Sequence, residues 1–354
     1  FQRNTDSNEP IVASSQSGPK HENDLSQAEA QNQTSNQQLN LIAQKDITPS
    51  FLLSYSKRRG LVYPNSSIYG GLQGQFDFGP IGTQIKKNIK DLWWKDFVER
   101  RLDMLSVDTS IIMHPQVWKE SGHIHCFTDK AIQCKECQAM FRLDHLVKDK
   151  LNVDTDHLSP EQMKEQLEEH KLCACDKKKP CNWSELLDFN LLFETNFGPI
   201  SSIGDSTSAA DKPRYFLRPE TAQGIFVNFL NVQKTGRMKI PFGIAQTGKA
   251  FRNEIVARQF IFRMREFEQM EMQFFVKPGE EMKWYEYWKE TRLKWHQSLG
   301  LGKENYRFHD HEKLAHYANA AADIEFNFPF GFKELEGIHS RTDFDLKAHE
   351  EFSG

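Results

Sequence analysis

Apolar residues recur at helical spacing in the first globular part of the chain. In "GPIGTQIKKNIKDLWWKDFVER", one face of a long amphipathic helix is formed by Ile85, Ile89, Leu92, Trp93 and Phe97. A shorter helix before the break at Arg59-Gly60 is predicted by the spacing of Phe51, Leu52 and Tyr55. Both segments are expected to pack one side against a core.

Two further helices have clear boundary signals. In "SPEQMKEQLEEHKL", Ser159 is placed as the N-cap, Pro160 at the first helical position, and Gln162 completes a capping box. Nearer the end of the chain, a helix that stops at Gly300 is predicted by the stripe Trp284, Trp288, Trp295 and Leu299.

Alternating polarity predicts strands elsewhere. "PFGIAQTGKAFRNE" and 263–275 are expected to form an antiparallel hairpin around the loop "IVARQ". "VDTSIIMHP" is predicted to be a strand ending at Pro115, and "AADIEFNFPFGFKELEGIHSRTDFDL" returns to strand-like alternation. Helices and antiparallel strands mix without regular βαβ alternation, so the expected class is α+β, with an antiparallel sheet flanked by helices.

The second strand of the hairpin separates two kinds of side chain. Its even positions end in apolar residues, whereas its odd positions include Arg263, Arg265, Phe267 and Glu271. With Arg252 and Glu254 from the first strand, this face has groups that neutralise phosphate, stack on a base and hold an ammonium group. A solvated, salt-bridged sheet face is the alternative, and the stretch alone leaves both open.

Composition sets the outer limits. Residues 1–45 are rich in Asn, Gln, Ser and Glu, so they are predicted to be a disordered, low-complexity tail. The net charge of −4 does not indicate a nucleic-acid partner, which would need a local basic patch. No apolar run is long enough for a membrane span, so no membrane association is expected.

Cysteines cluster on either side of the capped helix. Cys134 and Cys137 have the spacing of a zinc knuckle, and Cys175 and Cys181 are the expected second pair, with Cys173 as a competitor. Four thiolates would make the Zn²⁺ structural, because no coordination position stays open. The alternative is that these are fortuitous cysteines in a polar insertion.

Several motifs together resemble one enzyme family. "FRNE", a loop and "FIFRMREFEQMEMQFF" resemble the second signature motif of class II aminoacyl-tRNA synthetases. "RRGLVYPNSSIYGGLQGQFDFGPIG", "HPQVWKESGH", "FRLDHL", "YFLRPETAQGIFVNF" and "GIHSRTDFDL" are similar to the homodimeric glycyl-tRNA synthetases. The resemblance runs from about Ile47 to Gly354. It implies a class II catalytic domain over 46–125, with the dimerisation motif, and over 186–354, interrupted by a probable zinc-binding insertion over 126–185.

The resemblance also implies an activity. The expected reaction joins glycine to ATP as glycyl-adenylate and transfers it to tRNA(Gly), with Mg²⁺, in a cytoplasmic or organellar homodimer. Arg252 and Arg265 are the expected catalytic residues. The residues expected at ATP are Arg252, Asn253, Glu254, Phe262, Arg263, Met264, Arg265, Glu266, Phe267, Glu334 and Leu335. Those expected at glycine are Arg142, Glu220, Phe267, Glu268, Gln269, Met270, Glu271 and Arg341.

Three features differ from the family pattern, and one is the Asn/Gln/Ser-rich N-terminus, which has no counterpart in it. No segment before Gly354 resembles the third signature motif, a Gly-rich stretch with an arginine, and none resembles an anticodon-binding domain. We therefore expect the chain to be part of a synthetase, truncated before that motif. The alternatives are a catalytically inactive, synthetase-like nucleic-acid-binding or regulatory protein, and a class II synthetase for another small amino acid.

Overall fold

The computed structural model describes residues 47–153, 155, 157–170, 182–196, 214–257, 260–315 and 317–354. The chain divides into the units Phe1–Thr48 and Pro49–Gly354, and the helices and strands below belong to the second. The predicted tail over 1–45 lies outside the described residues. Within the described part, none of the helices is both long and apolar enough to cross a membrane.

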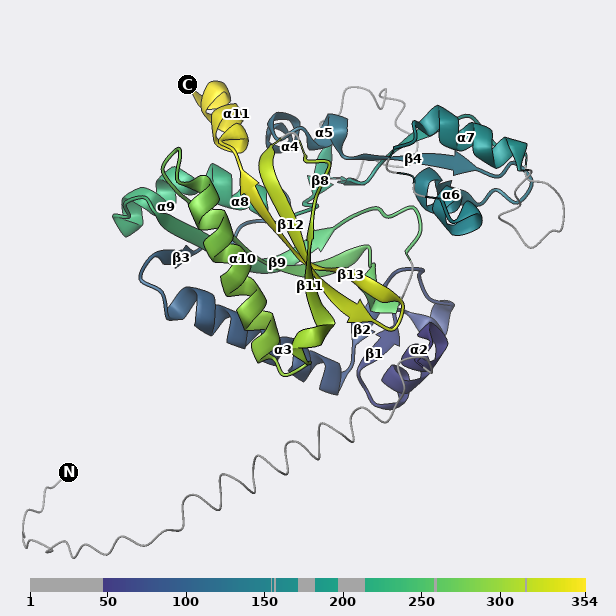
Figure 1. Ribbon diagram of the computed structural model, residues 1–354, viewed down its shortest axis with the longest axis horizontal. Helices are drawn as coiled ribbons and strands as arrows, with labels where there is room; N and C mark the ends of the chain where they lie inside the picture. The colour runs from purple at the N-terminus through teal and green to yellow at the C-terminus, as the bar shows by residue number, and fades with distance from the viewer. Residues whose placement is uncertain are drawn as a thin grey trace, which may run out of the picture. The chain divides into compact units, whose positions relative to one another are not determined.

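The described elements are helices and mostly antiparallel strands (Figure 1). The helices are α2 Pro49–Arg58, α3 Pro80–Trp94, α4 Pro115–Glu120, α5 His123–Cys126, α6 Leu143–Leu151, α7 Pro160–Glu169, α8 Ala222–Val227, α9 Phe229–Gly236, α10 Glu281–Ser298 and α11 Phe344–Ser353. The strands are β1 Val62–Pro64, β2 Phe76–Phe78, β3 Met104–Ser106, β4 Thr128–Gln133, β5 Met140–Arg142, β6 Leu187–Asn190, β7 Phe193–Thr195, β8 Tyr215–Leu217, β9 Phe242–Phe251, β10 Glu266–Phe275, β11 Tyr306–Asp310, β12 Ala318–Phe328 and β13 Gly331–Arg341.

Two three-stranded sheets form the centre of the molecule. One has the order β10-β9-β3, with β9 and β10 antiparallel and β3 parallel to β9; the other is the antiparallel sheet β11-β12-β13. Their shared core includes side chains from both sheets and from two long helices, and α10 lies along the second sheet (Figure 1). The buried members of this core are Trp93, Phe97, Val98, Met104, Ala245, Tyr285, Trp288, Trp295, Tyr306, Ala322, Ile324 and Ile338.

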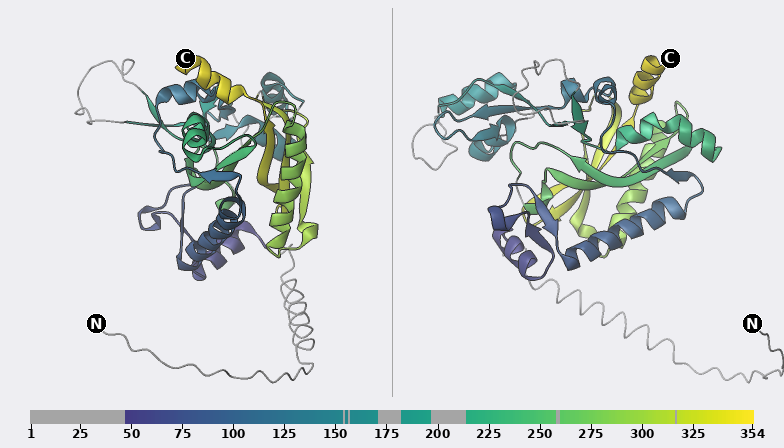
Figure 2. Two further views of the ribbon diagram at one scale, coloured as in Figure 1. Left: turned by 90° about the vertical axis from the view of Figure 1, so that its left-hand side faces the viewer. Right: turned by 180° about the vertical axis from the view of Figure 1, so that it is seen from behind.

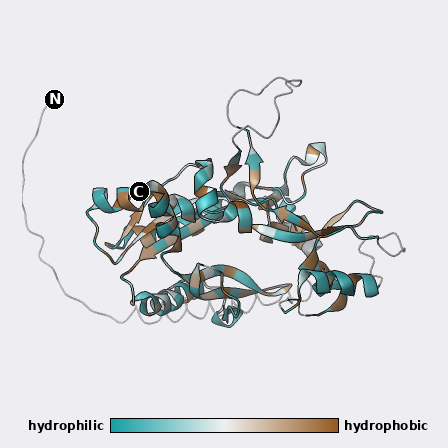
Figure 3. Cartoon of the chain, turned by 90° about the horizontal axis from the view of Figure 1, so that it is seen from above, coloured by the Kyte–Doolittle hydropathy of each residue, from teal (hydrophilic) through white to brown (hydrophobic). Residues whose placement is uncertain are grey.

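The predicted hairpin and the Trp-rich helix are confirmed. β9 and β10 pair along their whole length, from Phe242↔Phe275 to Phe251↔Glu266. In α10, Trp288 and Trp295 are buried, and the helix ends before Gly300, whose positive φ of 81° suits a residue without a Cβ. Hydrophobic and hydrophilic stretches alternate along the ribbons of the molecule in Figure 3, as expected for elements with one buried side.

The apolar stripe predicted for α3 divides into two surfaces. Trp93 and Phe97 are buried in the core, whereas Ile85, Ile89 and Leu92 are exposed. The helix continues into a π-helical turn over Lys95–Glu99, which rotates the following residues relative to an ideal helix. The single predicted face is therefore wrong, because periodicity does not show how many partners a helix has.

Two local predictions had opposite outcomes. The capping box of α7 is present, with Ser159 Oγ accepting from Gln162 N at 3.2 Å and Gln162 Oε1 accepting from Ser159 N at 2.8 Å. The strand predicted over 107–115 is wrong: β3 ends at Ser106, and only Ile112 forms a bridge, to Leu217. The alternation there reflects an extended connection and not a sheet strand.

A smaller sheet has two of its three strands in the segment 126–185 that was predicted to be an insertion. β4 pairs with β5 and with β6, and its core is shared with α6 and α7. This group stands to one side of the two central sheets in Figure 1 and in the right-hand view of Figure 2. The α+β class is confirmed.

Candidate active site

The hairpin separates two chemical faces, as its alternation predicts, but only from Glu266 onward. Arg263 and Arg265 precede β10, so strand parity does not apply to them. On the odd face, the Gln269 side chain accepts a hydrogen bond from Thr221 N at 3.1 Å and Glu271 accepts one from Thr221 Oγ1. On the even face, Met270, Met272 and Phe274 pack against the core.

Two carboxylates line one large cavity beside β10. Glu220 lies in the turn before α8, and Glu271 lies on β10; both line a cavity of about 1110 Å³ between the edge strands β10 and β13. Glu220 Oε1 is 3.4 Å from His123 Nε2 and 3.4 Å from Gln223 Nε2. Glu271 Oε1 accepts from Gln273 Nε2 at 2.8 Å. The cavity therefore contains two acidic groups whose hydrogen-bond partners are mostly neutral.

Their surroundings move the two pKa values in opposite directions. Burial raises the pKa of Glu271, and the nearby charge of Glu220 raises it further. Burial alone would also raise the pKa of Glu220, but its contact with His123 and the charges of two cavity arginines lower it. Glu220 is thus firmly ionised, whereas the ionised form of Glu271 would be stabilised by an added cation.

Arg341 is one of those two arginines, and it is held by neighbouring elements. Its Nε and Nη2 donate to Asp345 Oδ2 at 3.0 and 2.9 Å, and its guanidinium lies 3.9 Å from the centre of the Tyr317 ring. Asp345 also accepts from Gln223 Nε2 at 2.7 Å. These contacts tie α8 and α11 to the end of β13 beside the carboxylates.

Arg252 is the second cavity arginine, and it lies between two aromatic rings. Its guanidinium is 5.6 Å from the centre of the Phe127 ring and 5.3 Å from that of Phe267. Nε donates to Pro219 O at 3.1 Å. Phe127 and Tyr317 were not among the predicted site residues, because only the folded chain brings them near these arginines.

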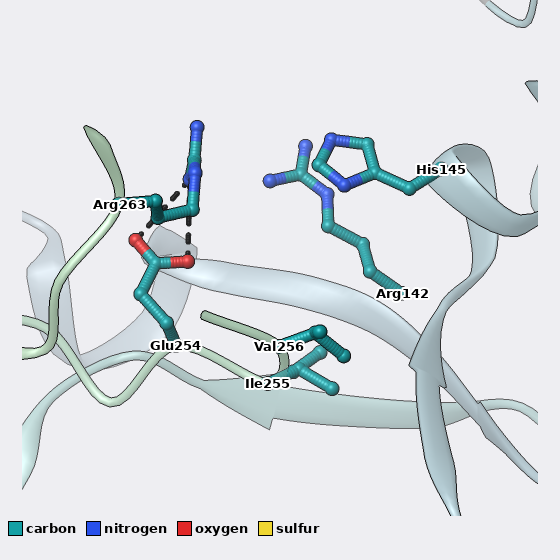
Figure 4. A pocket seen from close by; sticks show the side chains of 6 residues that line it. All are labelled: Arg142, His145, Glu254, Ile255, Val256 and Arg263. Atoms are coloured by element: carbon teal, nitrogen blue, oxygen red, sulfur yellow. Dashed lines mark hydrogen bonds and ion pairs between the residues drawn. The ribbon is translucent and has the colours of Figure 1, made fainter. Parts of the chain in front are cut away.

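The two other arginines of the hairpin that the structure describes have different partners. Arg265 donates through Nε to Glu254 O at 3.0 Å and through Nη1 to Gln73 O at 2.9 Å, so its guanidinium binds backbone. Arg263 Nη1 is 3.2 Å from both carboxylate oxygens of the buried Glu254 (Figure 4). Arg263 therefore binds a carboxylate side chain, whereas Arg265 binds backbone carbonyl oxygens.

Arg142 lies in the same small pocket as Arg263 and not in the large cavity (Figure 4). Asp144 holds it through Nε at 2.8 Å and Nη2 at 2.9 Å, and Asp129 Oδ2 is 3.3 Å from its Nη1. The structure therefore does not bring Arg142 to the carboxylate pair.

A β-bulge aims the acids of β13 to opposite sides. Ile324 pairs with Glu336, but the next residue, Glu325, pairs with Glu334, so Leu335 is the extra residue. Glu334 lines the cavity, where the charges of Arg252 and Arg263 act on it. Glu336 lines the same cavity but points to α10, where it accepts from Arg292 and His296. Without the bulge, two acids separated by one residue would share a face.

The other predicted residues have local partners. Glu268 forms ion pairs with Lys86 and Lys90 of α3 at 2.6 and 2.7 Å, and Glu266 pairs with Lys249 at 2.6 Å. Phe262 packs edge-on against Phe328 and Phe330. Asn253 N donates to Leu191 O at 2.8 Å, and Met264 is half-buried in the loop before β10.

The cysteine prediction falls partly outside the described residues. Cys134 is buried at the end of β4, and Cys137 follows in the turn to β5. Cys173, Cys175 and Cys181 are not among the described residues. Across the described part, no group of three or more His, Cys, Asp and Glu side chains is arranged to hold a metal ion.

Comparison with known proteins identifies the family. Residues 206–346 match the tRNA synthetase class II core domain (G, H, P, S and T). The chain is 48% identical to the glycine–tRNA ligase of Caldanaerobacter subterraneus over 315 residues, which are 87% of this chain and 66% of that protein. It is 47% identical to the glycine–tRNA ligase of Chlorobaculum tepidum, over 86% of this chain and 67% of that protein. This chain belongs to the glycine–tRNA ligase family.

Membership confirms the resemblance seen in the sequence. The chain spans about two thirds of the length of these relatives, and also of the Staphylococcus aureus enzyme, of which it covers 65% at 47% identity. A solved cytoplasmic serine–tRNA ligase from Naegleria fowleri shares the fold, with a TM-score of 0.52 and 13% identity over 84% of this chain and 54% of that one. The predicted class II catalytic fold is confirmed; the predicted zinc-binding subdomain is not shown.

Proposed function

We propose that this member of the glycine–tRNA ligase family activates glycine with ATP and transfers it to tRNA(Gly). The carboxylate pair Glu220 and Glu271 is the observation that supports it. Two acids in one cavity, one of them with a raised pKa, provide a place for the α-ammonium group of an amino acid. A glycine carboxylate oxygen would then attack the α-phosphorus, with pyrophosphate leaving.

The nucleotide would occupy the cavity beside the aromatic and basic side chains of the hairpin. Phe267 supplies a ring for adenine, and Arg252 supplies positive charge for the α-phosphate. Glu334 offers carboxylate oxygens for Mg²⁺, which usually binds one or two carboxylates together with phosphate oxygens. The ion would neutralise phosphate charge. Positioning and charge neutralisation are enough for this step, so no side-chain nucleophile is needed.

Transfer would follow at the same site. A terminal hydroxyl of tRNA(Gly) would attack the glycyl carbonyl carbon, and AMP would leave. Selectivity for glycine would come from excluding a Cβ, because accommodating one more methylene changes binding by only about 1–3 kcal/mol. Overlap with fixed atoms costs more than that.

Amino-acid-dependent exchange of pyrophosphate into ATP tests the proposal. We expect exchange with glycine and none with alanine or serine. Equal exchange with alanine would indicate a synthetase for another small amino acid. Binding of tRNA without any exchange would indicate the alternative, a synthetase-like binding protein.

We also propose that the protein is a homodimer that uses α3. Four apolar residues of this helix are 38% to 53% exposed and recur every three or four positions: Ile81, Ile85, Ile89 and Leu92. A continuous apolar stripe of this kind is typical of a protein interface.

Finally, we propose one structural Zn²⁺ bound by Cys134, Cys137, Cys175 and Cys181. The first pair lies on a tight turn, in which Gln138 N donates to Cys134 O at 2.8 Å. Lys135 N in this turn donates to Asn182 O at 2.8 Å, and Asn182 follows Cys181 in the sequence. Elemental analysis should find about one zinc per chain, and none in a Cys134→Ser variant. A zinc-free wild-type protein would contradict this proposal.

A further inference from the structure

The segment before the insertion forms part of the cavity wall next to Glu220. Ser121 and His123 line the cavity, and the His123 side chain is only 11% exposed. His123 Nε2 is 3.4 Å from Glu220 Oε1, and its Nδ1 is 2.8 Å from Ser121 Oγ. The imidazole therefore connects the turn between α4 and α5 to one of the two carboxylates.

The contacts of this ring favour a proton on Nε2. An ionised carboxylate only accepts hydrogen bonds, so Nε2 must carry the proton that Glu220 receives. Nδ1 of the neutral ring is then an acceptor, and the Ser121 hydroxyl, which can donate, is its partner. Both ring nitrogens are therefore used, Nε2 toward Glu220 and Nδ1 toward Ser121.

Aromatic neighbours hold the plane of the ring. Trp118 is fully buried and meets His123 edge-on, with ring centres 5.4 Å apart. Phe127 is a second aromatic neighbour of His123, and the centres of their rings are also 5.4 Å apart. The Phe127 ring in turn contacts the guanidinium of Arg252. The imidazole is therefore built into the wall and is not a surface side chain.

We propose that His123 is a positioning residue that holds the Glu220 carboxylate for the ammonium group of glycine. The inference rests on the proposed function and adds a residue to its site. His123 and Gln223 both contact Oε1. Among the described residues no hydrogen bond to Oε2 is recorded, so this oxygen is available to the substrate. His123 thus fixes one oxygen of Glu220 from the cavity wall, and the charges of Arg341 and Arg252 also act on this carboxylate.

The test uses four variants of the whole protein: His123→Ala, His123→Gln, Ser121→Ala and His125→Ala. Glutamine keeps an N–H donor, and loss of the Ser121 hydroxyl leaves the ring but removes the contact that selects its tautomer. His125 is exposed in the same helix and serves as the control. The measurements are the KM for glycine, the KM for ATP, and the pKa of Glu220 followed by carbon NMR of the carboxyl group.

We expect His123→Ala to raise the glycine KM by about tenfold, the effect of losing a hydrogen bond to a charged group, with a change below threefold in the ATP KM. It should also raise the pKa of Glu220. His123→Gln should restore most of the glycine KM, Ser121→Ala should lie between wild type and His123→Ala, and His125→Ala should match wild type.

Three results would overturn the role. One is an unchanged glycine KM in a folded His123→Ala variant; another is a His123→Gln variant as defective as His123→Ala; the third is an equal rise in both KM values. If His123→Ala does not fold, the glutamine and Ser121 variants decide. A wild-type protein that binds no glycine would refute the proposed function, and the NMR titration would still show whether His123 controls Glu220.

Discussion

Replacing Glu271 by glutamine separates its proposed binding role from a structural one. Glutamine has nearly the same shape, and its carbonyl oxygen can still accept a hydrogen bond from Thr221 or Gln273. What is lost is the negative charge toward the glycine ammonium. A hydrogen bond to a charged group contributes about 1.5–3 kcal/mol, so the glycine KM should rise about 10- to 160-fold.

The same substitution should not lower stability in the absence of glycine. Burial and the charge of Glu220 raise the pKa of Glu271 in the folded state. A raised pKa means that protonated Glu271 stabilises the folded state. This stabilisation is complete below the ordinary glutamate pKa and is lost as the pH rises through the raised pKa of Glu271 in the folded protein. At neutral pH, Glu271→Gln should therefore be at least as stable as wild type, because glutamine cannot ionise beside Glu220.

A matched control lies on the opposite face of the same strand. Glu268 pairs with Lys86 and Lys90, whose charges and hydrogen bonds lower its pKa despite burial. Glu268→Gln should lose about 1 kcal/mol of stability, since the partners are partly exposed, and keep the glycine KM of wild type.

Urea unfolding and glycine-dependent pyrophosphate exchange measure the two effects in both variants. The reasoning fails if Glu271→Gln keeps its glycine KM within threefold of wild type. It also fails if Glu268→Gln raises this KM as much as Glu271→Gln does.

Three further changes test the nucleotide site, the network behind β13 and the surface of α3. Phe267→Ala should weaken ATP binding by about 1–3 kcal/mol in calorimetry, with Phe262→Ala as the comparison, and unchanged ATP affinity would contradict the stacking role. Arg292→Met should lower the unfolding free energy by about 3 kcal/mol, because it leaves the largely buried carboxylate of Glu336 with His296 as its remaining partner. Burial alone would raise the pKa of Glu336, but Arg292 and His296 lower it to about 2. The stabilisation from these two partners is therefore present above the ordinary glutamate pKa and is lost on acidification toward pH 2. Ile85→Glu should yield a monomer in analytical ultracentrifugation where Lys87→Glu does not; a dimer in both would exclude this face.

Local signals predicted the parts of the fold that depend on local contacts. The capping box at Ser159 needs only residues three positions apart, and the hairpin needs only two alternating segments around a loop. The α3 stripe shows the limit of this reasoning. Its apolar residues recur at one helical spacing, but Trp93 is buried in the core and Ile85 is exposed. This difference depends on which elements, far away in the sequence, pack against each part of the helix.

The site was predicted residue by residue through resemblance, and the structure adds the geometry. Glu220, Glu271, Arg252 and Arg341 do line one cavity. The bulge at Leu335 was not foreseen, because a single extra residue leaves no mark on the alternation pattern. The contacts of His123 were also out of reach, since a histidine in a short helix has the same sequence signal whether it faces solvent or a carboxylate.

The two faces of β10 show why the residue type alone does not define the chemistry. On the even face, Lys86 and Lys90 lie one helical turn apart in α3, so both reach Glu268 and neutralise it. On the odd face, the hydrogen-bond partners of Glu271 are the neutral groups of Thr221 and Gln273. Identical carboxyl groups three residues apart thus have pKa values shifted in opposite directions. The lysines of α3 neutralise Glu268 on the even face. On the odd face Glu271 has no such cation among its hydrogen-bond partners, and the ammonium group of an amino-acid substrate would supply one.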